Sequence, residues 1–232
     1  MIEPVSVTHH IQKFILDVLM YQKSARFRDL RPPKVDTNLF SYHLKNLVKV
    51  GMVDKVDDGY ALSAAGLSYV DRVSSEDKSI RTQPKIITML VVQNGEGDIL
   101  LQRRTKQPYI ETWTLPYGKI HIDDISAKAA AQREAFEKLG LKNQEVEQAG
   151  DCYIRVYAHG ELISTTLAHV FRFYKDDIET DENLVWARPH KLHDFELAPA
   201  VEEIMTRTFF KDAFYFEEYG VEWPATTVEM VQ

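Results

Sequence analysis

The spacing of the apolar residues changes once along the chain, at a polar stretch, and this change constrains the fold most strongly. Before residue 74 a helical stripe begins with Ile11, Phe14, Ile15, Val18 and Leu19. Residues 74–79 carry no large apolar side chain, and residues 85–93 (KIITMLVVQ) form the continuous β-rich run of a strand buried on both faces. We therefore predict a domain over residues 1–75, a linker over 76–84 and a second domain over 85–232.

Bulk properties exclude several classes of protein. No apolar run approaches the roughly 20 residues that a membrane-spanning helix needs, and the N-terminus has no signal-peptide pattern, so we expect no membrane partner. Cys152 is the single cysteine, which excludes an intramolecular disulfide framework and favours the reducing cytoplasm. The net charge of −7 is uneven. Residues 1–72 hold ten Lys/Arg and eight Asp/Glu, whereas the remainder holds 18 and 27, so only the first domain is suited to nucleic acid.

The first domain contains the pattern of three helical elements, a hairpin and a last helix. We predict helices over residues 9–21, 38–50 and 63–73, and a short element over 26–30 that ends before two prolines. Asp36 or Thr37 can cap the helix over 38–50, whose buried face we assign to Phe40, Leu44, Leu47 and Val48. The turn Asp57-Asp58-Gly59 between two short apolar runs indicates a hairpin.

The stretch NLFSYHLKNLVKVGMVDKVDDGYALSAAGL resembles the winged helix-turn-helix family, with residues 38–50 in the position of the recognition helix. The resemblance implies DNA as a partner. The side chains that we expect on the outward, DNA-binding face of this helix are Asn38, Ser41, Tyr42, Lys45 and Lys49. A role in protein interaction or dimerisation is the alternative, because the predicted wing tip is acidic. His43 is interpreted as a packing residue.

In the second domain the segment LLQRRTKQPYIETWTLPYGKIHIDDISAKAAAQREAFEKLGL resembles the Nudix family, over roughly residues 85–210. We expect a helix over residues 126–139 ending at Gly140, strands near 85–93, 99–104, 147–157 and 162–174, and a last helix over 199–210. The predicted fold class is α+β: an N-terminal winged helix-turn-helix followed by a Nudix-like α/β/α sandwich with a mixed sheet.

The resemblance implies a site that cleaves a nucleoside diphosphate linked to another moiety, with Mg²⁺ or Mn²⁺. Gly118 opens the signature and REAFEKLGL closes it, so Arg133, Glu134 and Glu137 are the catalytic candidates. Carboxylates at this spacing lie on one side of a helix, and hard divalent cations prefer oxygen ligands. We assign Glu134, Glu137 and Asp124 as metal ligands, with Asp123 as the alternative to Asp124.

The signature is degenerate at two places. Lys138 stands where the family usually has a metal-binding carboxylate, and an ammonium repels a divalent cation. The loop after Gly118 also carries one extra residue, which displaces the expected acid to Asp124. Three interpretations follow: a transcriptional regulator that senses a nucleoside-diphosphate-type ligand without a cofactor, a slow Mg²⁺- or Mn²⁺-dependent Nudix hydrolase, and a dimerisation scaffold. The fusion to a DNA-binding domain favours the regulator.

Further ligand-binding candidates lie near this signature. Lys138 is suited to contact ligand phosphate directly, and Gly118 lies at the expected site. Strand alternation aims one of Arg103 and Arg104 inward, while Trp113 either stacks on a nucleobase or packs beside the Leu115-Pro116 turn. The C-terminal extension FFKDAFYFEEYGVEWP is rich in aromatics, so we expect it to pack on the Nudix-like core or on a second subunit. A homodimer would suit both domains.

Overall fold

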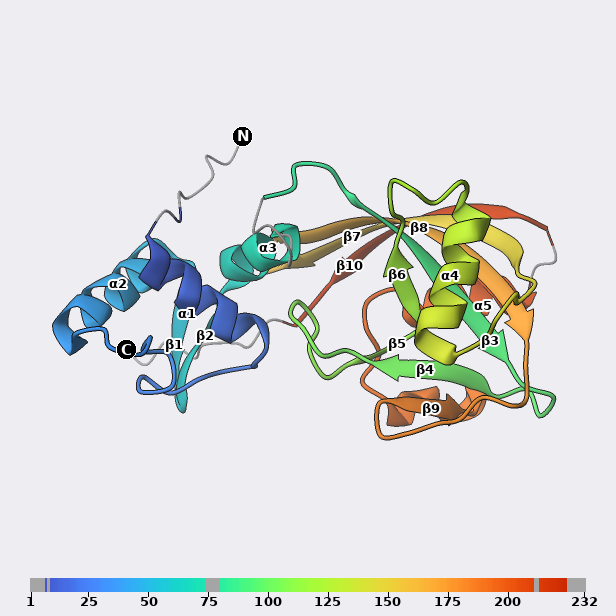
Figure 1. The fold of residues 1–232 in the computed structure, drawn as a ribbon, viewed down its shortest axis with the longest axis horizontal. Helices are drawn as coiled ribbons and strands as arrows, with labels where there is room; N and C mark the ends of the chain where they lie inside the picture. Colours follow the sequence, from blue (N-terminus) through green and yellow to red (C-terminus); the bar gives the residue numbers. More distant parts are fainter. Residues whose placement is uncertain (1–6, 8, 74–79, 211–212, 225–232) are drawn as a thin grey trace.

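The computed structural model describes residue 7 and residues 9–73, 80–210 and 213–224. Residues 76–79 of the predicted linker, residues 211–212 of the predicted aromatic extension and residues 225–232 of the predicted second domain lie outside the described residues. The chain forms two lobes, with the N-terminal helices in blue on the left of Figure 1 and the large sheet on the right.

Two amphipathic helices begin the N-terminal lobe, α1 (His10–Met20) and α2 (Thr37–Lys49). Asp36 caps α2, because its carboxylate accepts hydrogen bonds from the backbone N–H groups of Asn38 and Leu39. The apolar faces of α1 and α2 meet in a core that includes Ile11, Ile15, Leu19, Phe40, Leu44 and Leu47. The assignment of Val48 to the buried face was wrong: its side chain is 37% exposed. Residues 26–30 form a single hydrogen-bonded turn.

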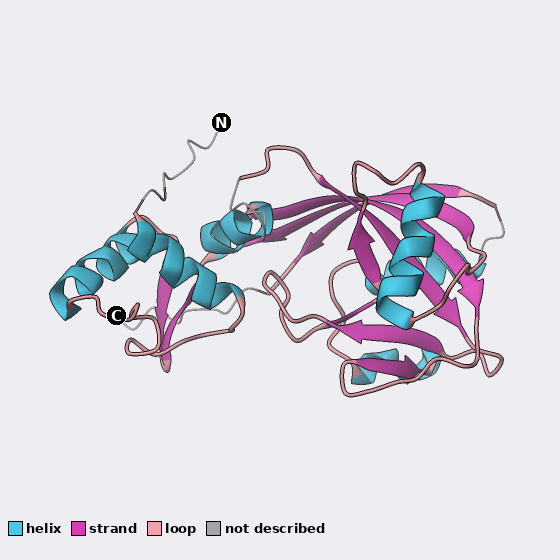
Figure 2. Ribbon diagram, viewed as in Figure 1, coloured by secondary structure: helices cyan, strands magenta, loops and turns pink. Residues whose placement is uncertain are grey.

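A two-stranded antiparallel ribbon and a third helix complete this lobe, namely β1 (Val53–Val56), β2 (Gly59–Leu62) and α3 (Ala64–Arg72). Gly59 at the turn has a φ of 143° and leaves no room for a Cβ beside the Ala25 carbonyl, so both its conformation and its surroundings require glycine. Figure 2 shows the ribbon among the helices. This order of elements is compatible with the predicted winged helix-turn-helix, with a single turn in place of a helix between α1 and α2.

The C-terminal lobe is built on an eight-stranded sheet in the order β10-β7-β8-β3-β4-β5, with β6 paired to β3 and β9 paired to β4. The pairs β3–β8 and β10–β7 are parallel and the other pairs are antiparallel, so the sheet is mixed as predicted. The strands are β3 (Lys85–Gln93), β4 (Ile99–Arg103), β5 (Trp113–Thr114), β6 (Tyr117–Lys119), β7 (Glu147–Ala158), β8 (Glu161–Tyr174), β9 (Leu184–Ala187) and β10 (Tyr215–Glu222).

Helices cover both faces of the sheet, as a Nudix-like sandwich requires. Helix α4 (Ala127–Leu139) crosses the front face in Figure 1; α5 (Val201–Phe210) and the 3₁₀ helix η1 (Pro189–Asp194) complete the lobe. Strand β3 alternates between two clusters, since Leu90 and Val92 pack with Ala131 and Ala135 of α4. The side chains of β3 that point the other way, Ile87, Met89 and Val91, join a cluster that includes Val201, Ile204 and Met205 of α5.

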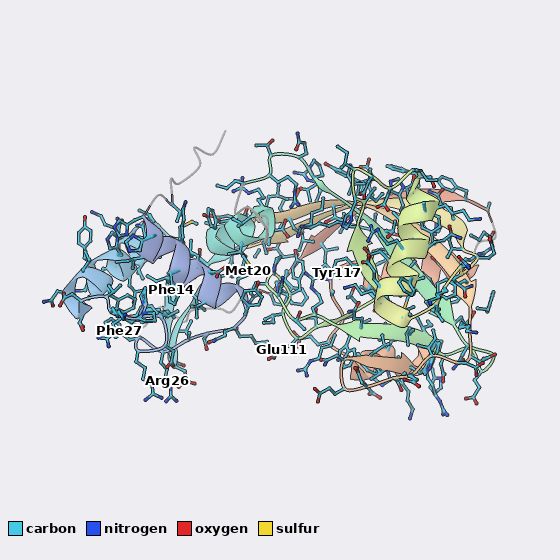
Figure 3. The ribbon with its side chains drawn as sticks, viewed as in Figure 1. Phe14, Met20, Arg26, Phe27, Glu111 and Tyr117 are labelled. Carbon is cyan, nitrogen blue, oxygen red and sulfur yellow. The ribbon has the colours of Figure 1, made fainter. Side chains whose placement is uncertain are left out.

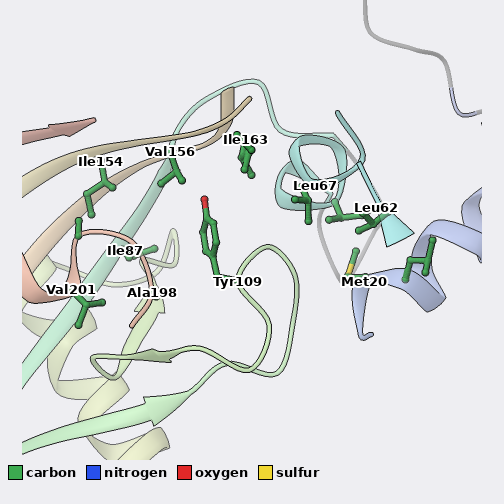
Figure 4. Close-up of a cluster of buried hydrophobic side chains, with 14 of the residues drawn as sticks. Met20, Leu62, Leu67, Ile87, Tyr109, Ile154, Val156, Ile163, Ala198 and Val201 are labelled. Carbon is green, nitrogen blue, oxygen red and sulfur yellow. The ribbon is translucent and has the colours of Figure 1, made fainter. Parts of the chain in front are cut away.

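One hydrophobic cluster runs through both lobes without interruption. Figure 4 follows it from Met20, Leu62 and Leu67 in the N-terminal lobe to Tyr109, Ile163 and Val156 in the sheet lobe. Helix α3 packs against β8. Continuous packing of this kind resists independent movement of the lobes, because separating them would expose apolar surface to water.

Polar contacts at the same junction come from the loop after β4. The Gln107 backbone N–H donates to the Met20 carbonyl at 2.9 Å, and Lys23 forms an ion pair with Glu111 at 3.0 Å. Figure 3 shows Met20 at this junction. The loop is therefore bonded to the end of α1 as well as packed on it.

The aromatic C-terminal segment packs on the sheet lobe, one of the two outcomes expected for it. Residues 215–222 add β10 to the sheet edge, in parallel to β7. The Tyr215 hydroxyl lies 2.8 Å from the Thr208 hydroxyl of α5, and the Trp223 ring meets the Tyr109 ring edge-on at 5.1 Å. None of the helices among the described residues has the length and apolar character needed to cross a membrane.

Candidate functional site

A pocket of about 380 Å³ lies between the two lobes, over the Nudix-like signature. We call it the shared pocket, because α3 lines one side while β3, β4, β6 and α4 line the others. Its cationic side chains outnumber its carboxylates six to three, although the whole chain is acidic. The six cations are Lys85, Arg103, Arg104, Lys106, Lys119 and Lys138, and the three carboxylates are Asp71, Glu134 and Glu137. The charges of its lining favour an anionic ligand.

The floor of the pocket is the contact between Gly118 on β6 and Glu134 on α4. A Cβ at position 118 would overlap the Glu134 carboxyl group, so only glycine lets the helix approach the strand this closely. Glu134 is 3% exposed as a result. The predicted importance of Gly118 thus has a steric cause here: its missing side chain makes the space that the carboxyl group fills.

Arg133 lies among three carboxylates. Its guanidinium donates to Asp124 at 2.8 and 3.0 Å, to Glu134 at 2.6 Å and to Glu137 at 3.2 Å. It also donates to the Lys119 carbonyl at 2.9 Å, which ties α4 to β6. The hydrogen bonds from Arg133 are the main cause that lowers the pKa of Asp124 to about 2.

Asp124 closes the loop that carries the extra residue. Besides its bonds to Arg133, its carboxylate accepts a hydrogen bond at 2.7 Å from the His121 backbone N–H. The loop is therefore folded against α4 by a charged contact, with Ile122 and Ile125 left fully exposed to solvent. Asp124 is used as the partner of Arg133 in this arrangement.

The residues present do not fit a divalent cation. Within the described ranges, His, Cys, Asp and Glu side chains form no group of three that is placed to hold a metal ion. The predicted ligands Asp124, Glu134 and Glu137 are each hydrogen-bonded to Arg133, and Lys138 adds a further positive charge at the same pocket. Mg²⁺ and Mn²⁺ require several free oxygen ligands, so we derive no catalytic step through either metal.

The predicted phosphate contacts reach the shared pocket. Lys138 on α4 is exposed there, and it has no hydrogen bond or ion pair with any other described residue. Arg103 and Arg104 both line the pocket, whereas strand alternation predicted only one of them. Lys138, Arg103 and Arg104 therefore all lie around the shared pocket.

Arg104 is the most constrained of these cations. Its guanidinium donates to the Tyr117 hydroxyl at 2.7 Å and to the Pro108 carbonyl at 3.0 Å. It lies over the rings of Tyr109 and Tyr117, 5.4 and 5.2 Å from their centroids. Its Nε is buried and has no hydrogen-bond partner among the described residues. Arg104 is thus a preorganised positive charge with one donor left over.

Trp113 lies outside the shared pocket. Its ring meets the Phe195 ring edge-on at 5.6 Å, and its backbone N–H donates to the Glu196 carbonyl at 2.8 Å. Of the two alternatives predicted for Trp113, this environment agrees with packing. It does not support a contact between Trp113 and a nucleobase.

The predicted DNA-contact side chains lie on one helix, α2. Asn38, Tyr42, Lys45 and Lys49 are exposed and Ser41 is half-buried. His43 on the same helix is a packing residue, as interpreted: it is buried, and its ring stacks on His9 with centroids 3.8 Å apart. Burial and the neighbouring His9 and His10 lower the pKa of His43, so its ring is uncharged near neutral pH.

The sequence did not predict Asp71, the carboxylate that the N-terminal lobe contributes to the shared pocket. Asp71 lies near the end of α3, next to the buried Val70 and four residues after the buried Leu67. It forms an ion pair with Lys85, the first residue of β3. An acidic residue on the apolar face of a predicted helix signals a buried partner, but nothing in the sequence identifies which cation that is.

A sequence model of the NUDIX domain matches residues 83–215, which is more than half of the chain. The chain therefore belongs to the Nudix family.

Several solved structures are similar to part of this chain. The mutator MutT protein of Bacillus halodurans is 18% identical, with 59% of this chain and 89% of that chain covered and a TM-score of 0.48. The NUDIX domain of Shewanella oneidensis NrtR, complexed with ADP ribose, is 14% identical, with 61% and 94% covered and a TM-score of 0.46. NrtR complexed with a 27mer DNA is 15% identical, with 53% and 59% covered and a TM-score of 0.42.

Proposed function

We propose that this chain is a ligand-responsive transcriptional regulator, in which the Nudix pocket binds a nucleoside-diphosphate-type molecule and the N-terminal lobe binds DNA. The observation that carries the proposal is the shared pocket itself. It is lined by both lobes and has a cationic excess, so an anionic ligand bound there would contact α3 of the N-terminal lobe directly.

The chemistry of the pocket favours a diphosphate bound without a metal. A diphosphate carries two or more negative charges, and Lys138, Arg103 and Arg104 provide positive charges around the shared pocket. The pocket volume of about 380 Å³ lies within the common range for small-molecule sites, about 300–1,000 Å³.

The second candidate function is slow hydrolysis that requires Mg²⁺ or Mn²⁺. The observation in its favour is that Glu134 and Glu137 keep the spacing of the family signature beside Arg133. Its cost is that Arg133 bonds to both oxygens of Asp124 and to one oxygen each of Glu134 and Glu137, so few carboxylate oxygens are left for a metal. The scaffold interpretation and the homodimer stay predictions.

The test is a DNA-binding titration with a labelled fragment of the gene's own promoter region, in EDTA, with and without ADP-ribose. We expect salt-sensitive binding, because phosphate contacts release counterions. We also expect ADP-ribose to change the affinity by about fivefold or more, the lower range of ordinary allosteric coupling.

Two other outcomes would contradict the proposal in different ways. If no promoter fragment binds at low salt, the DNA-binding assignment is wrong. If DNA binds with an affinity that a saturating ligand leaves unchanged, the two activities are not coupled and the regulator interpretation is lost. Release of a nucleoside monophosphate in Mg²⁺ would support the hydrolase instead.

A further inference from the structure

Asp71 is a buried carboxylate that joins the two lobes. Its side chain is 3% exposed, and its Oδ1 is bonded to the ammonium of Lys85, which is itself 20% exposed. The guanidinium of Arg81 lies 3.8 Å from Asp71 Oδ2 and donates to the Asp71 carbonyl at 2.9 Å. The Asp71 carboxylate of α3 thus faces two cations, Lys85 at the start of β3 and Arg81 in the segment before it.

The same carboxylate lines the cavity that would hold the ligand. Asp71 and Lys85 both border the shared pocket, and both also border a smaller adjoining cavity of about 70 Å³ together with Arg104 and Tyr117. The negative charge of Asp71 therefore stands among the cations that favour an anionic ligand. Of the three carboxylates in the pocket, Asp71 alone comes from the N-terminal lobe, and Glu134 and Glu137 are bonded to Arg133.

We propose that Lys85 belongs to a phosphate subsite of the shared pocket and that Asp71 occupies this subsite as an internal competitor for ligand phosphate. The proposal rests on the function proposed above and names the subsite and its regulation. The diphosphate of the ligand carries two charges, one on each phosphate, and several acceptor oxygens, whereas Asp71 carries one charge. A phosphate that reaches Lys85 therefore displaces the weaker anion.

The competition gives ligand binding a direct route to the DNA-binding lobe. Asp71 lies in the last turn of α3, and α3 packs against β8 between the sheet and the helices of the N-terminal lobe. Loss of the Lys85 partner leaves the buried carboxylate with the Arg81 guanidinium 3.8 Å away as its remaining cation, and it brings a second anion close by. Both effects are unfavourable, so we expect α3 to shift and let Asp71 move toward Arg81 or water. Since coupling is reciprocal, whatever holds α3 in place also weakens ligand binding.

The experiment measures ligand affinity by calorimetry in EDTA, with ADP-ribose and with inorganic pyrophosphate as separate probes. Asp71→Asn keeps the size of the side chain and an acceptor for Lys85, but removes the competing charge. We expect this variant to bind both probes about tenfold more tightly, and Lys85→Gln to bind them about tenfold more weakly, the size of one charged hydrogen bond. The matched control is Asp57→Asn, which removes the same charge from the exposed hairpin tip and should leave the affinity unchanged.

The outcomes separate this proposal from the one on which it rests. If the wild-type chain binds neither these probes nor any other nucleoside diphosphate derivative, the proposed function fails and the subsite fails with it. If the wild type binds a probe and Asp71→Asn binds it equally or more weakly, Asp71 is structural and only the subsite proposal is overturned.

A second measurement avoids the variants, in case Asp71→Asn does not fold. Hydrogen exchange of the α3 backbone amides is compared in the wild-type chain with and without ADP-ribose. Displacement of Asp71 predicts faster exchange near the end of α3 when the probe is bound. Slower or unchanged exchange there would overturn the displacement.

Discussion

Gly118 and Glu134 show how a single missing side chain positions a functional group. The sequence pattern identified Gly118 as the start of the family signature, and the structure supplies the reason, since the Glu134 carboxyl group fills the place of a Cβ. Other side-chain contacts could not be predicted from the sequence. Asp124 and Arg133 are nine residues apart across a loop with an extra residue, and Asp71 and Lys85 lie on different lobes, so neither pairing follows from spacing.

The Gly118→Ala variant tests this contact. We expect its free energy of unfolding to fall by about 1–3 kcal/mol, because the added methyl group must push a buried carboxylate away from Arg133. Urea denaturation measures the effect. The matched control is Gly220→Ala on β10, where nothing lies within 4 Å of the new Cβ. Equal stabilities for the two variants would show that the close approach of β6 to α4 does not exist in solution.

At the scale of helices and strands, elements with a strong local pattern were predictable and elements that depend on distant partners were not. The apolar run of β3 matched its prediction closely, because burial is encoded in its own residues. The helical stripe of α1 matched as well except at Phe14, whose side chain is 36% exposed. Strand β10 was not predicted, since its parallel pairing with β7 joins residues 65 positions apart, and the sequence gives no local signal for such a pair. The sequence predicted only that this aromatic segment packs on the Nudix-like core or on a second subunit.

Helix α2 carries the prediction for DNA. Lys45→Ala combined with Lys49→Ala should weaken binding to the promoter fragment about tenfold or more and reduce the salt dependence by about two phosphate contacts. Both side chains are exposed, so the fold and the affinity for ADP-ribose should stay unchanged. The control pair, Lys142→Ala with Lys191→Ala, removes the same charge from the sheet lobe. A similar loss of DNA affinity in the control pair would place the DNA surface elsewhere or make the effect one of net charge alone.

At the scale of the whole molecule, the two lobes share one hydrophobic cluster and one cationic pocket. Composition predicted the division of charge between the lobes, but not that a pocket with six cations would form within an acidic chain. That arrangement depends on how β4, β6 and α4 meet α3, which is a property of the tertiary fold. We propose that this pocket binds a diphosphate without a metal.

A thermal-shift panel tests that claim most directly. The wild-type chain is heated with ADP-ribose, sugar nucleotides, dinucleotides and nucleoside triphosphates, each in Mg²⁺ and in EDTA, and the ligand is recovered afterwards. A ligand at about 100 times its Kd should raise the Tm by about 5–10 °C, since binding stabilises the folded state by mass action. We expect a shift that survives EDTA, with the ligand recovered intact. A shift that requires Mg²⁺, with the ligand cleaved, would contradict it and identify the chain as a metal-dependent hydrolase.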